Sequence, residues 1–124
     1  MQSHNLGGNI PFEIERLDHI SMDRVPDEEP PSSKIKRSRV LVDCNSMGAR
    51  GIERAVEVYG ADRILFGSDG TRFGMTWTDR AITDAAISDE EKALIRSGNA
   101  LTFLDTIHAR RKAPARNQHT PSHA

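Results

Sequence analysis

The sequence has 124 residues, a formal net charge of -1 and a hydrophobic fraction of 36%. This length suits one domain, and the nearly balanced charge excludes a global field that would attract nucleic acid or an acidic surface. The hydrophobic fraction is modest for a self-sufficient globular protein, which indicates that part of the chain is solvated tail or loop.

Cysteine content and hydropathy indicate the compartment. The single cysteine, Cys44, cannot form an internal disulfide, which suits a reducing environment. No apolar segment approaches the roughly 20 residues needed to cross a bilayer. The N-terminus has neither the basic nor the apolar region of a signal peptide. We therefore expect a cytoplasmic protein with no membrane and no nucleic-acid partner.

A histidine and a double glycine stand close to the start of the chain, ahead of a predicted helix. Pro11 suits the first position of that helix, and apolar residues recur around it at helical spacing. These apolar residues are Ile10, Ile14, Leu17 and Ile20. From Arg24 to Arg37 the chain is polar and rich in proline, which predicts a loop.

Two apolar runs predict strands joined by a helix. The first covers about residues 39–44 and the second about 63–67. Between them, apolar residues at i, i+3, i+4 and i+7 predict a helix over 49–59, which Gly60 ends in the left-handed region. A strand, a helix and a strand with short connections form a βαβ unit, so we expect an α/β fold with parallel strands.

The second predicted strand leads into Gly67-Ser68-Asp69-Gly70, the stretch on which the functional interpretation depends. In a parallel α/β sheet, the carboxyl ends of the strands meet the ligand. A carboxylate delivered to such an end between glycines is therefore a candidate catalytic group. The alternative is that Asp69 caps a turn or the start of a helix, as Asp before Gly often does.

Beyond Asp69, the sequence predicts an irregular loop followed by short helices. The first helix is expected over about 78–86. Ser88 and Glu91 form a capping box that starts the next helix. The Gly98-Asn99 pair is expected to break this helix before a further helical turn or two over 100–104.

The C-terminal segment has the composition of a solvated tail. From Thr106 onward the chain has basic residues, prolines and histidines but no acidic residue and few apolar ones. We therefore expect one domain over residues 1–105 and a disordered basic tail over 106–124.

Four segments together carry a resemblance to a known family. They are HNLGGNIP at 4–11, VD at 42–43, GADRILFGSD at 60–69 and IRSGNA at 95–100. In this order and spacing, they resemble the C-terminal third of an amidohydrolase-related protein. This metal-dependent (β/α)8 barrel group includes aminocarboxymuconate semialdehyde decarboxylase and related hydrolases and decarboxylases. The resemblance covers about residues 3–104 and implies a C-terminal fragment of a TIM-like barrel.

The resemblance implies roles for two residues. His4 would end strand 6 of the barrel and act as an acid/base or substrate-polarising group. Asp69 would end strand 8, bind the catalytic divalent metal, usually zinc, and accept a proton from the attacking water. The other metal ligands of the family, a His-x-His pair on strand 1 and a histidine on strand 5, would precede this chain. Gly70-Thr71 departs from the aromatic or apolar residue and proline that many members have, so the substrate loops are expected to differ.

Other residues near the strand ends are weaker candidates for the functional site. Asn45 and Arg72 are candidates for contacting substrate. Asp43, at the end of a strand, is expected to be structural. Cys44 is also expected to be structural, because a small buried thiol suits a barrel wall. Trp77 is expected to fill the core rather than to bind a substrate ring.

The resulting hypothesis is the C-terminal portion of a metal-dependent enzyme that uses a metal-activated water for hydrolysis or decarboxylation of a small-molecule substrate. A catalytic zinc needs about three protein ligands, and Asp69 with His4 are too few. The isolated chain is therefore expected to be inactive, and homo-oligomerisation stays open. The alternative is a non-catalytic α/β interaction module that binds a partner through its exposed strand edge.

Overall fold

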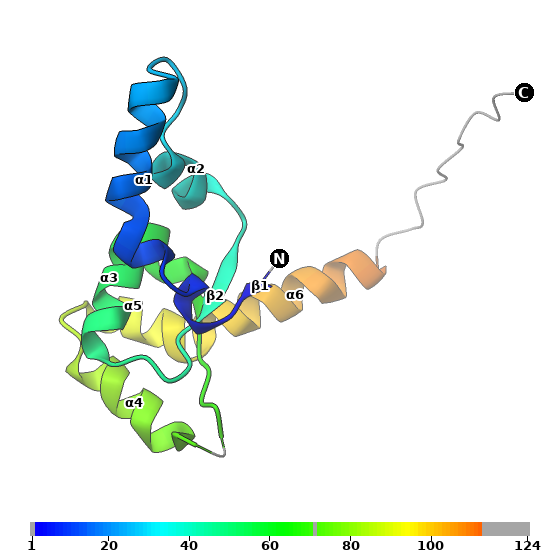
Figure 1. Ribbon diagram of the computed structural model, residues 1–124. Helices are drawn as coiled ribbons and strands as arrows, with labels where there is room; N and C mark the ends of the chain where they lie inside the picture. Colours follow the sequence, from blue (N-terminus) through cyan, green and yellow to red (C-terminus); the bar gives the residue numbers. More distant parts are fainter. Residues whose placement is uncertain (1, 71, 113–124) are drawn as a thin grey trace, which may run out of the picture.

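The computed structural model describes residues 2–70 and 72–112 and has a three-stranded parallel sheet at its centre (Figure 1). The strands are β1 (Gln2–Ser3), β2 (Leu41–Asp43) and β3 (Ile64–Leu65), in the order β1-β2-β3. Val42 lies in register with Ser3 on one side and with Ile64 on the other. The predicted α/β fold with parallel strands is confirmed, although both predicted strands are shorter than expected.

Helices surround this small sheet. The α-helices are α1 (Ile10–Arg24), α2 (Pro31–Arg37), α3 (Ala49–Tyr59), α4 (Gly74–Asp84), α5 (Asp89–Ala93) and α6 (Asn99–Lys112). Short turns of other helix types are η1 (Asn5–Gly7), η2 (Ala61–Arg63) and the π-helix η3 (Leu94–Gly98). Among the described residues, no helix is both long and apolar enough to cross a membrane.

Helix α3 connects β2 to β3 and supplies much of the core. Its bounds match the predicted 49–59, and Gly60 follows it with a φ of 95°. Ile52, Ala55 and Tyr59 are buried at helical spacing, as the sequence periodicity predicted. They belong to one apolar cluster with Val42 and with further residues of the sheet and helices.

Helix α1 confirms the predicted helix, but most of its apolar face is exposed. Only Ile14 of the four apolar residues on that face is buried, whereas Ile10, Leu17 and Ile20 are exposed. A helix with this spacing normally buries its apolar stripe against a neighbour. The described part of the chain therefore does not cover the whole apolar face of α1.

Helix α2 lies where a loop was expected. Pro31 suits the first turn because a proline there removes no helical hydrogen bond. The Asp18 carboxylate of α1 accepts a hydrogen bond from the Ser32 N–H at 2.9 Å, which satisfies one free donor at the start of α2. Glu29 lies just before the helix, and its carboxylate pairs at 2.6 Å with Arg37, the last residue of α2. The contact between Asp18 and Ser32 thus supports a helix in a segment whose prolines predicted a loop.

The last helices form one nearly continuous rod. The predicted capping box at Ser88 and Glu91 is confirmed and starts α5. The predicted break at Gly98-Asn99 is wrong, because the helix passes through η3 into α6. The Asn99 side-chain amide donates to the carbonyl oxygens of Ala61 and Ile64, both at 2.7 Å. These buried bonds hold the helix against the start of β3.

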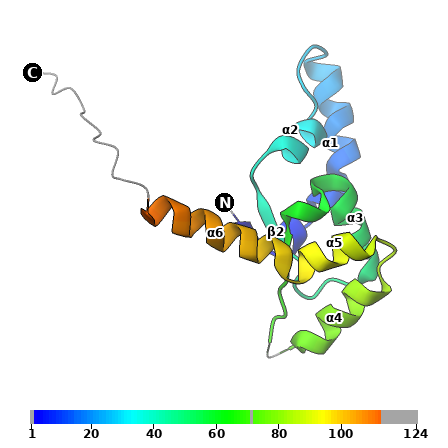
Figure 2. The same cartoon turned by 180° about the vertical axis from the view of Figure 1, so that it is seen from behind.

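Helix α6 extends away from the rest of the fold (Figure 2). The expected disordered tail from residue 106 is wrong for residues 106–112, since α6 continues to Lys112. Almost all side chains from residue 100 to 112 are exposed. The rest of the predicted tail, residues 113–124, lies outside the described part of the chain.

The turn after β1 packs directly against α3. The backbone has positive φ from Asn5 through Gly8, and the Tyr59 hydroxyl donates to the Leu6 carbonyl at 2.8 Å. A Cβ on Gly7 would overlap the Tyr59 hydroxyl oxygen, whereas a Cβ on Gly8 would meet no atom within 4 Å. The two glycines therefore share a backbone requirement but differ in their steric surroundings.

Replacing each of these glycines by alanine separates the two effects. Gly8→Ala is expected to cost about 1–2 kcal/mol of unfolding free energy from positive φ alone. Gly7→Ala is expected to cost about 1–3 kcal/mol more, because its methyl group also overlaps Tyr59. Urea unfolding measures both values. In a Tyr59→Phe background the excess cost at Gly7 is expected to shrink, and an unchanged excess would contradict the packing explanation.

Candidate functional site

The strand ends gather the polar residues of the sheet. Because the three strands are parallel, their carboxyl ends lie at one edge. His4 follows β1 directly, Asp43 ends β2, and the segment 67–69 follows β3 after Phe66. In parallel α/β folds this edge is the one that meets ligands.

Asp43 is the centre of a hydrogen-bonded cluster at this edge. Its Oδ2 lies 2.9 Å from His4 Nδ1, and its Oδ1 accepts from the backbone N–H groups of Asn5 and Asn45, both at 3.2 Å. The side-chain amide nitrogen of Asn45 lies 3.2 Å from His4 Nε2. The Asp43 side chain is 10% exposed and that of His4 is 66% exposed. A buried carboxylate thus holds an accessible imidazole.

Gly67 brings the end of β3 against this cluster. A Cβ on Gly67 would come within 3.1 Å of the Asn45 Cβ and 3.4 Å of the Asp43 Cβ, so a larger residue would push the strand ends apart. On its other side, the Gly67 carbonyl accepts a hydrogen bond at 2.7 Å from the hydroxyl of Thr78, a buried residue of α4. Gly67 therefore positions the β3 exit between the cluster and α4.

Left-handed backbone marks all three strand exits. The non-glycine residues with positive φ in the described chain are Asn5 (48°), Leu6 (55°), Ser46 (55°) and Asp69 (47°). Each lies within four residues after a strand end. A positive φ is unfavourable in free energy for any residue other than glycine, and residues in this conformation are concentrated at functional sites. Backbone geometry therefore points to the same edge as the polar side chains do.

Asp69 is exposed and begins the turn into α4. Its backbone carbonyl accepts from the N–H groups of Arg72 at 2.9 Å and Phe73 at 3.3 Å. This leaves the position of Asp69 fixed by main-chain bonds while its carboxylate faces solvent. The turn-forming alternative and the ligand-binding interpretation are therefore compatible at this residue.

The remaining predicted site residues have different surroundings. Arg72 is exposed on the turn after Asp69. Asn45 is buried, and its side-chain amide contacts His4. The expectation that Trp77 fills the core is wrong, since the residue is 46% exposed and its ring packs on Phe73 with centroids 5.9 Å apart.

The described residues do not by themselves fit a divalent metal. No three His, Cys, Asp or Glu side chains within residues 2–70 and 72–112 are grouped so that they could hold one. Asp69 has a suitable carboxylate donor, but a catalytic zinc needs about three protein ligands. A metal at this edge would therefore need ligands from outside the described part of the chain.

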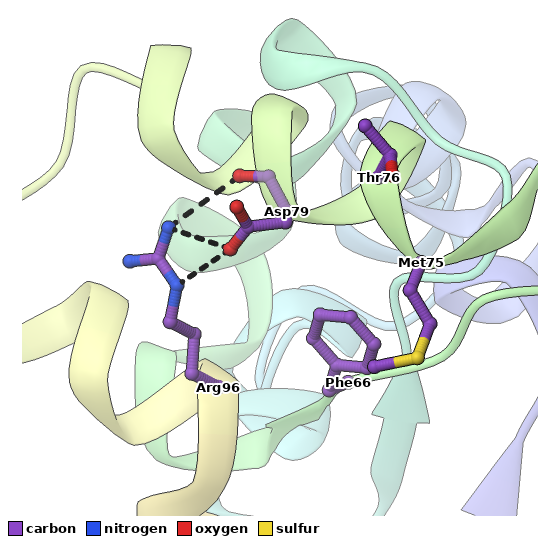
Figure 3. A pocket seen from close by; sticks show the side chains of 5 residues that line it. All are labelled: Phe66, Met75, Thr76, Asp79 and Arg96. Atoms are coloured by element: carbon purple, nitrogen blue, oxygen red, sulfur yellow. Dashed lines mark hydrogen bonds and ion pairs between the residues drawn. The ribbon is translucent and has the colours of Figure 1, made fainter.

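The larger of two described pockets is lined by residues around α4 and the end of β3 (Figure 3). Its volume is about 430 Å³, and it is lined by Phe66, Met75, Thr76, Asp79 and Arg96. Arg96 and Asp79 pair at 3.1 Å on its wall. A second pocket of about 270 Å³ lies among residues of α1, α2 and α3. Neither is lined by His4, Asp43 or Asp69, so the candidate site is an open edge.

Comparison with protein families decides the affiliation. The family described as amidohydrolase matches residues 42–106, a little over half of the chain. This chain belongs to the amidohydrolase family. The match runs from Val42 in β2 through β3 and into α6, and no curated protein sequence matches the chain.

Solved structures agree with this fold. A 5-carboxyvanillate decarboxylase from Sphingomonas paucimobilis is 22% identical, with a TM-score of 0.67 over 84% of this chain. A 2,6-dihydroxybenzoate decarboxylase from Rhizobium is 18% identical, with a TM-score of 0.69 over 86%. A dihydroxybenzoic acid decarboxylase from Polaromonas sp. JS666, with bound manganese and the inhibitor 2-nitroresorcinol, is 18% identical, with a TM-score of 0.70 over 91%.

This chain is much shorter than these proteins. It covers 33% of the Sphingomonas chain, 34% of the Rhizobium chain and 36% of the Polaromonas chain. It therefore spans about a third of the length of an amidohydrolase-family barrel. The recognised family and the predicted barrel-fragment fold are confirmed.

Sequence reasoning missed the role of Asp43 as the partner of His4. Asp43 was expected to be structural, and no feature of the sequence measures the 2.9 Å contact between side chains 39 residues apart. A usable signal did exist. The resemblance implied that His4 ends a barrel strand, and Asp43 lies near the end of the strand predicted over about 39–44; adjacent parallel strands bring such ends together.

The buried thiol of Cys44 gives a test of the sheet. Burial raises the pKa of Cys44, so little of the reactive thiolate exists at neutral pH. Iodoacetamide labelling is expected to be at least about 100-fold slower in the native chain than in denaturant, because it requires local opening. Mass spectrometry follows the reaction, with glutathione as the reagent control. Equal native and denatured rates would contradict the buried position.

Proposed function

We propose that this chain is the C-terminal portion of a metal-dependent amidohydrolase-type enzyme. The enzyme would hydrolyse or decarboxylate a small-molecule substrate by breaking a bond next to a carboxylate. The observation that supports this most directly is the pairing of His4 with Asp43 at the carboxyl edge of one parallel sheet, the edge from which the exit of β3 leads to Asp69. Family membership gives this edge its chemical context.

His4 is proposed as the acid/base or substrate-polarising group. Its imidazole is exposed at the site edge while Asp43 holds one of its ring nitrogens. Histidine is the side chain that most often transfers protons in active sites. The cluster thus provides a proton-handling group that is oriented but still accessible.

Asp69 is proposed to give one carboxylate ligand to a divalent metal, with zinc as the first choice. Manganese is the metal bound in the Polaromonas structure and is the second choice. A bound metal would supply Lewis-acid polarisation and water activation. The missing ligands would come from sequence outside this chain, and Arg72 is proposed to contact the substrate.

The isolated chain is proposed to be inactive. A complete (β/α)8 barrel takes about 250 residues, and this chain spans about a third of its structural relatives. The barrel domain is proposed to cover residues 1–105. The single cysteine favours a cytoplasmic location.

A non-catalytic interaction module is the second candidate. In the described chain β1 and β3 each pair only with β2, so their outer edges are free to add a strand. The DNA upstream of Met1 separates the two proposals. An in-frame extension encoding a strand that ends in His-x-His favours the enzyme, whereas a promoter and ribosome-binding site immediately upstream favour the module.

Asp69→Asn in the longer protein tests the enzymatic proposal. Loss of the negative carboxylate ligand is expected to lower metal affinity by at least 10-fold and turnover by more than 100-fold. Metal content by mass spectrometry and substrate turnover are the readouts. Asp84→Asn, at an exposed residue ending α4, is the matched control.

Two results would reject the proposal. The first is unchanged metal content and turnover in Asp69→Asn. The second is near-stoichiometric zinc with hydrolytic turnover in the isolated 124-residue chain, which would reject the view that most of the site lies elsewhere.

A further inference from the structure

We propose that Asp43 is a positioning residue that fixes His4 as the tautomer with its proton on Nδ1, and that Asn45 is a second positioning residue at Nε2. The inference rests on the proposed function, because it assigns the atom of His4 that exchanges protons with substrate. It concerns residues that lie entirely within the described chain.

The first step is the direction of the His4–Asp43 hydrogen bond. A carboxylate only accepts hydrogen bonds, so the nitrogen that faces it must carry the hydrogen. His4 Nδ1 lies 2.9 Å from Asp43 Oδ2. The neutral imidazole therefore has its hydrogen on Nδ1 and its lone pair on Nε2.

The second step is the contact on the opposite side of the ring. The Asn45 amide nitrogen lies 3.2 Å from His4 Nε2, and this NH2 group can only donate. It therefore requires the lone pair on Nε2 that the first contact already implies. Asn45 is 7% exposed, and its Oδ1 has no hydrogen-bond partner within the described residues. The amide nitrogen is thus directed to His4 while the amide oxygen is left without a bond.

The third step is the rigidity of Asp43. Its Oδ1 accepts backbone N–H groups from Asn5 and Asn45, which belong to the exits of two different strands. These bonds fix the carboxylate so that Oδ2 alone remains for His4. Preorganised hydrogen bonds of this kind set the orientation of a catalytic imidazole.

The two ring nitrogens of His4 therefore have different roles. Nδ1–H faces the buried carboxylate, which stabilises positive charge when the ring gains a proton. Nε2 is the atom that accepts or returns a proton, after its neutral amide contact is displaced by substrate. The 66% exposure of the His4 side chain leaves room for that exchange.

The side-chain nitrogens of His4 test this assignment in the full chain. Nitrogen-15 NMR with long-range proton correlation distinguishes protonated from unprotonated ring nitrogens, and His4→Gln identifies the signals by their loss. In the wild type, Nδ1 is expected to give the protonated signature and Nε2 the unprotonated one. An Nε2–H tautomer, or the averaged mixture of a free histidine, would overturn the proposal.

Asp43→Asn makes a prediction that a merely structural role does not. Two backbone donors face Oδ1, so the new amide is expected to keep its oxygen there and turn its NH2 toward His4. Nδ1 must then accept, and the Asn45 amide is expected to turn its Oδ1 toward the hydrogen now on Nε2, so the two nitrogen signatures are expected to exchange. Asp62→Asn, at an exposed residue of η2, is the matched control and is expected to change neither.

A second variant keeps the test independent of Asp43. Asn45→Ala removes the donor to Nε2 but leaves the carboxylate, so the Nδ1–H tautomer is expected to persist while the Nε2 signal shifts. Retention of the wild-type signals in both variants would overturn the proposed roles. In the longer enzyme, Asp43→Asn is expected to lower kcat by about 10²–10⁴-fold with little change in KM.

The outcomes separate this inference from the proposed function. The tautomer is measured without metal or turnover, so it can fail while Asp69→Asn still abolishes activity. Conversely, Asp69→Asn can leave turnover unchanged while the His4 signatures stand. A normal kcat in Asp43→Asn together with exchanged signatures would reject His4 as the proton-transfer group and retain only its fixed tautomer.

Discussion

The bonds of the Asp43 carboxylate join the exits of β1 and β2 into one rigid edge. One oxygen takes two backbone N–H groups, and the other faces the imidazole of His4. Parallel pairing alone brings the strand ends near each other, but it does not fix the side chains beyond them. Gly67 completes the arrangement, because the absence of a Cβ lets the β3 exit approach Asp43 and Asn45. The geometry of the candidate site therefore depends on the carboxylate of Asp43 and on the absence of a side chain at Gly67.

Much of the fold was predictable because local and tertiary preferences agree. Helix α3 has strong apolar periodicity and ends at a glycine with positive φ, and its bounds match the prediction. The capping box at Ser88 satisfies its own backbone donors, so it too is encoded locally. The failures occur where distant contacts decide. Asn99 holds the rod against β3, so the helix continues through Gly98. Asp18 supplies the hydrogen bond that starts α2.

The candidate site was predictable only in part. His4 and Asp69 were identified through a family resemblance, and the structure places both at strand exits. The pairing of His4 with Asp43 could not be derived from spacing, because it joins side chains on neighbouring strands. The environment of Asp69 is also incomplete in the described chain, where too few ligands converge for a metal. Chemistry that depends on residues of other strands cannot be derived from these 124 residues.

The free outer edges of β1 and β3 have a consequence for biosynthesis. In the longer polypeptide that we propose, these three strands leave the ribosome after the strands that precede them, since synthesis runs from the N-terminus. The edge backbone groups of the preceding strands would then stay unpaired until β1 and β3 of this chain paired with them. Closure of the ring would therefore have to follow the synthesis of this piece.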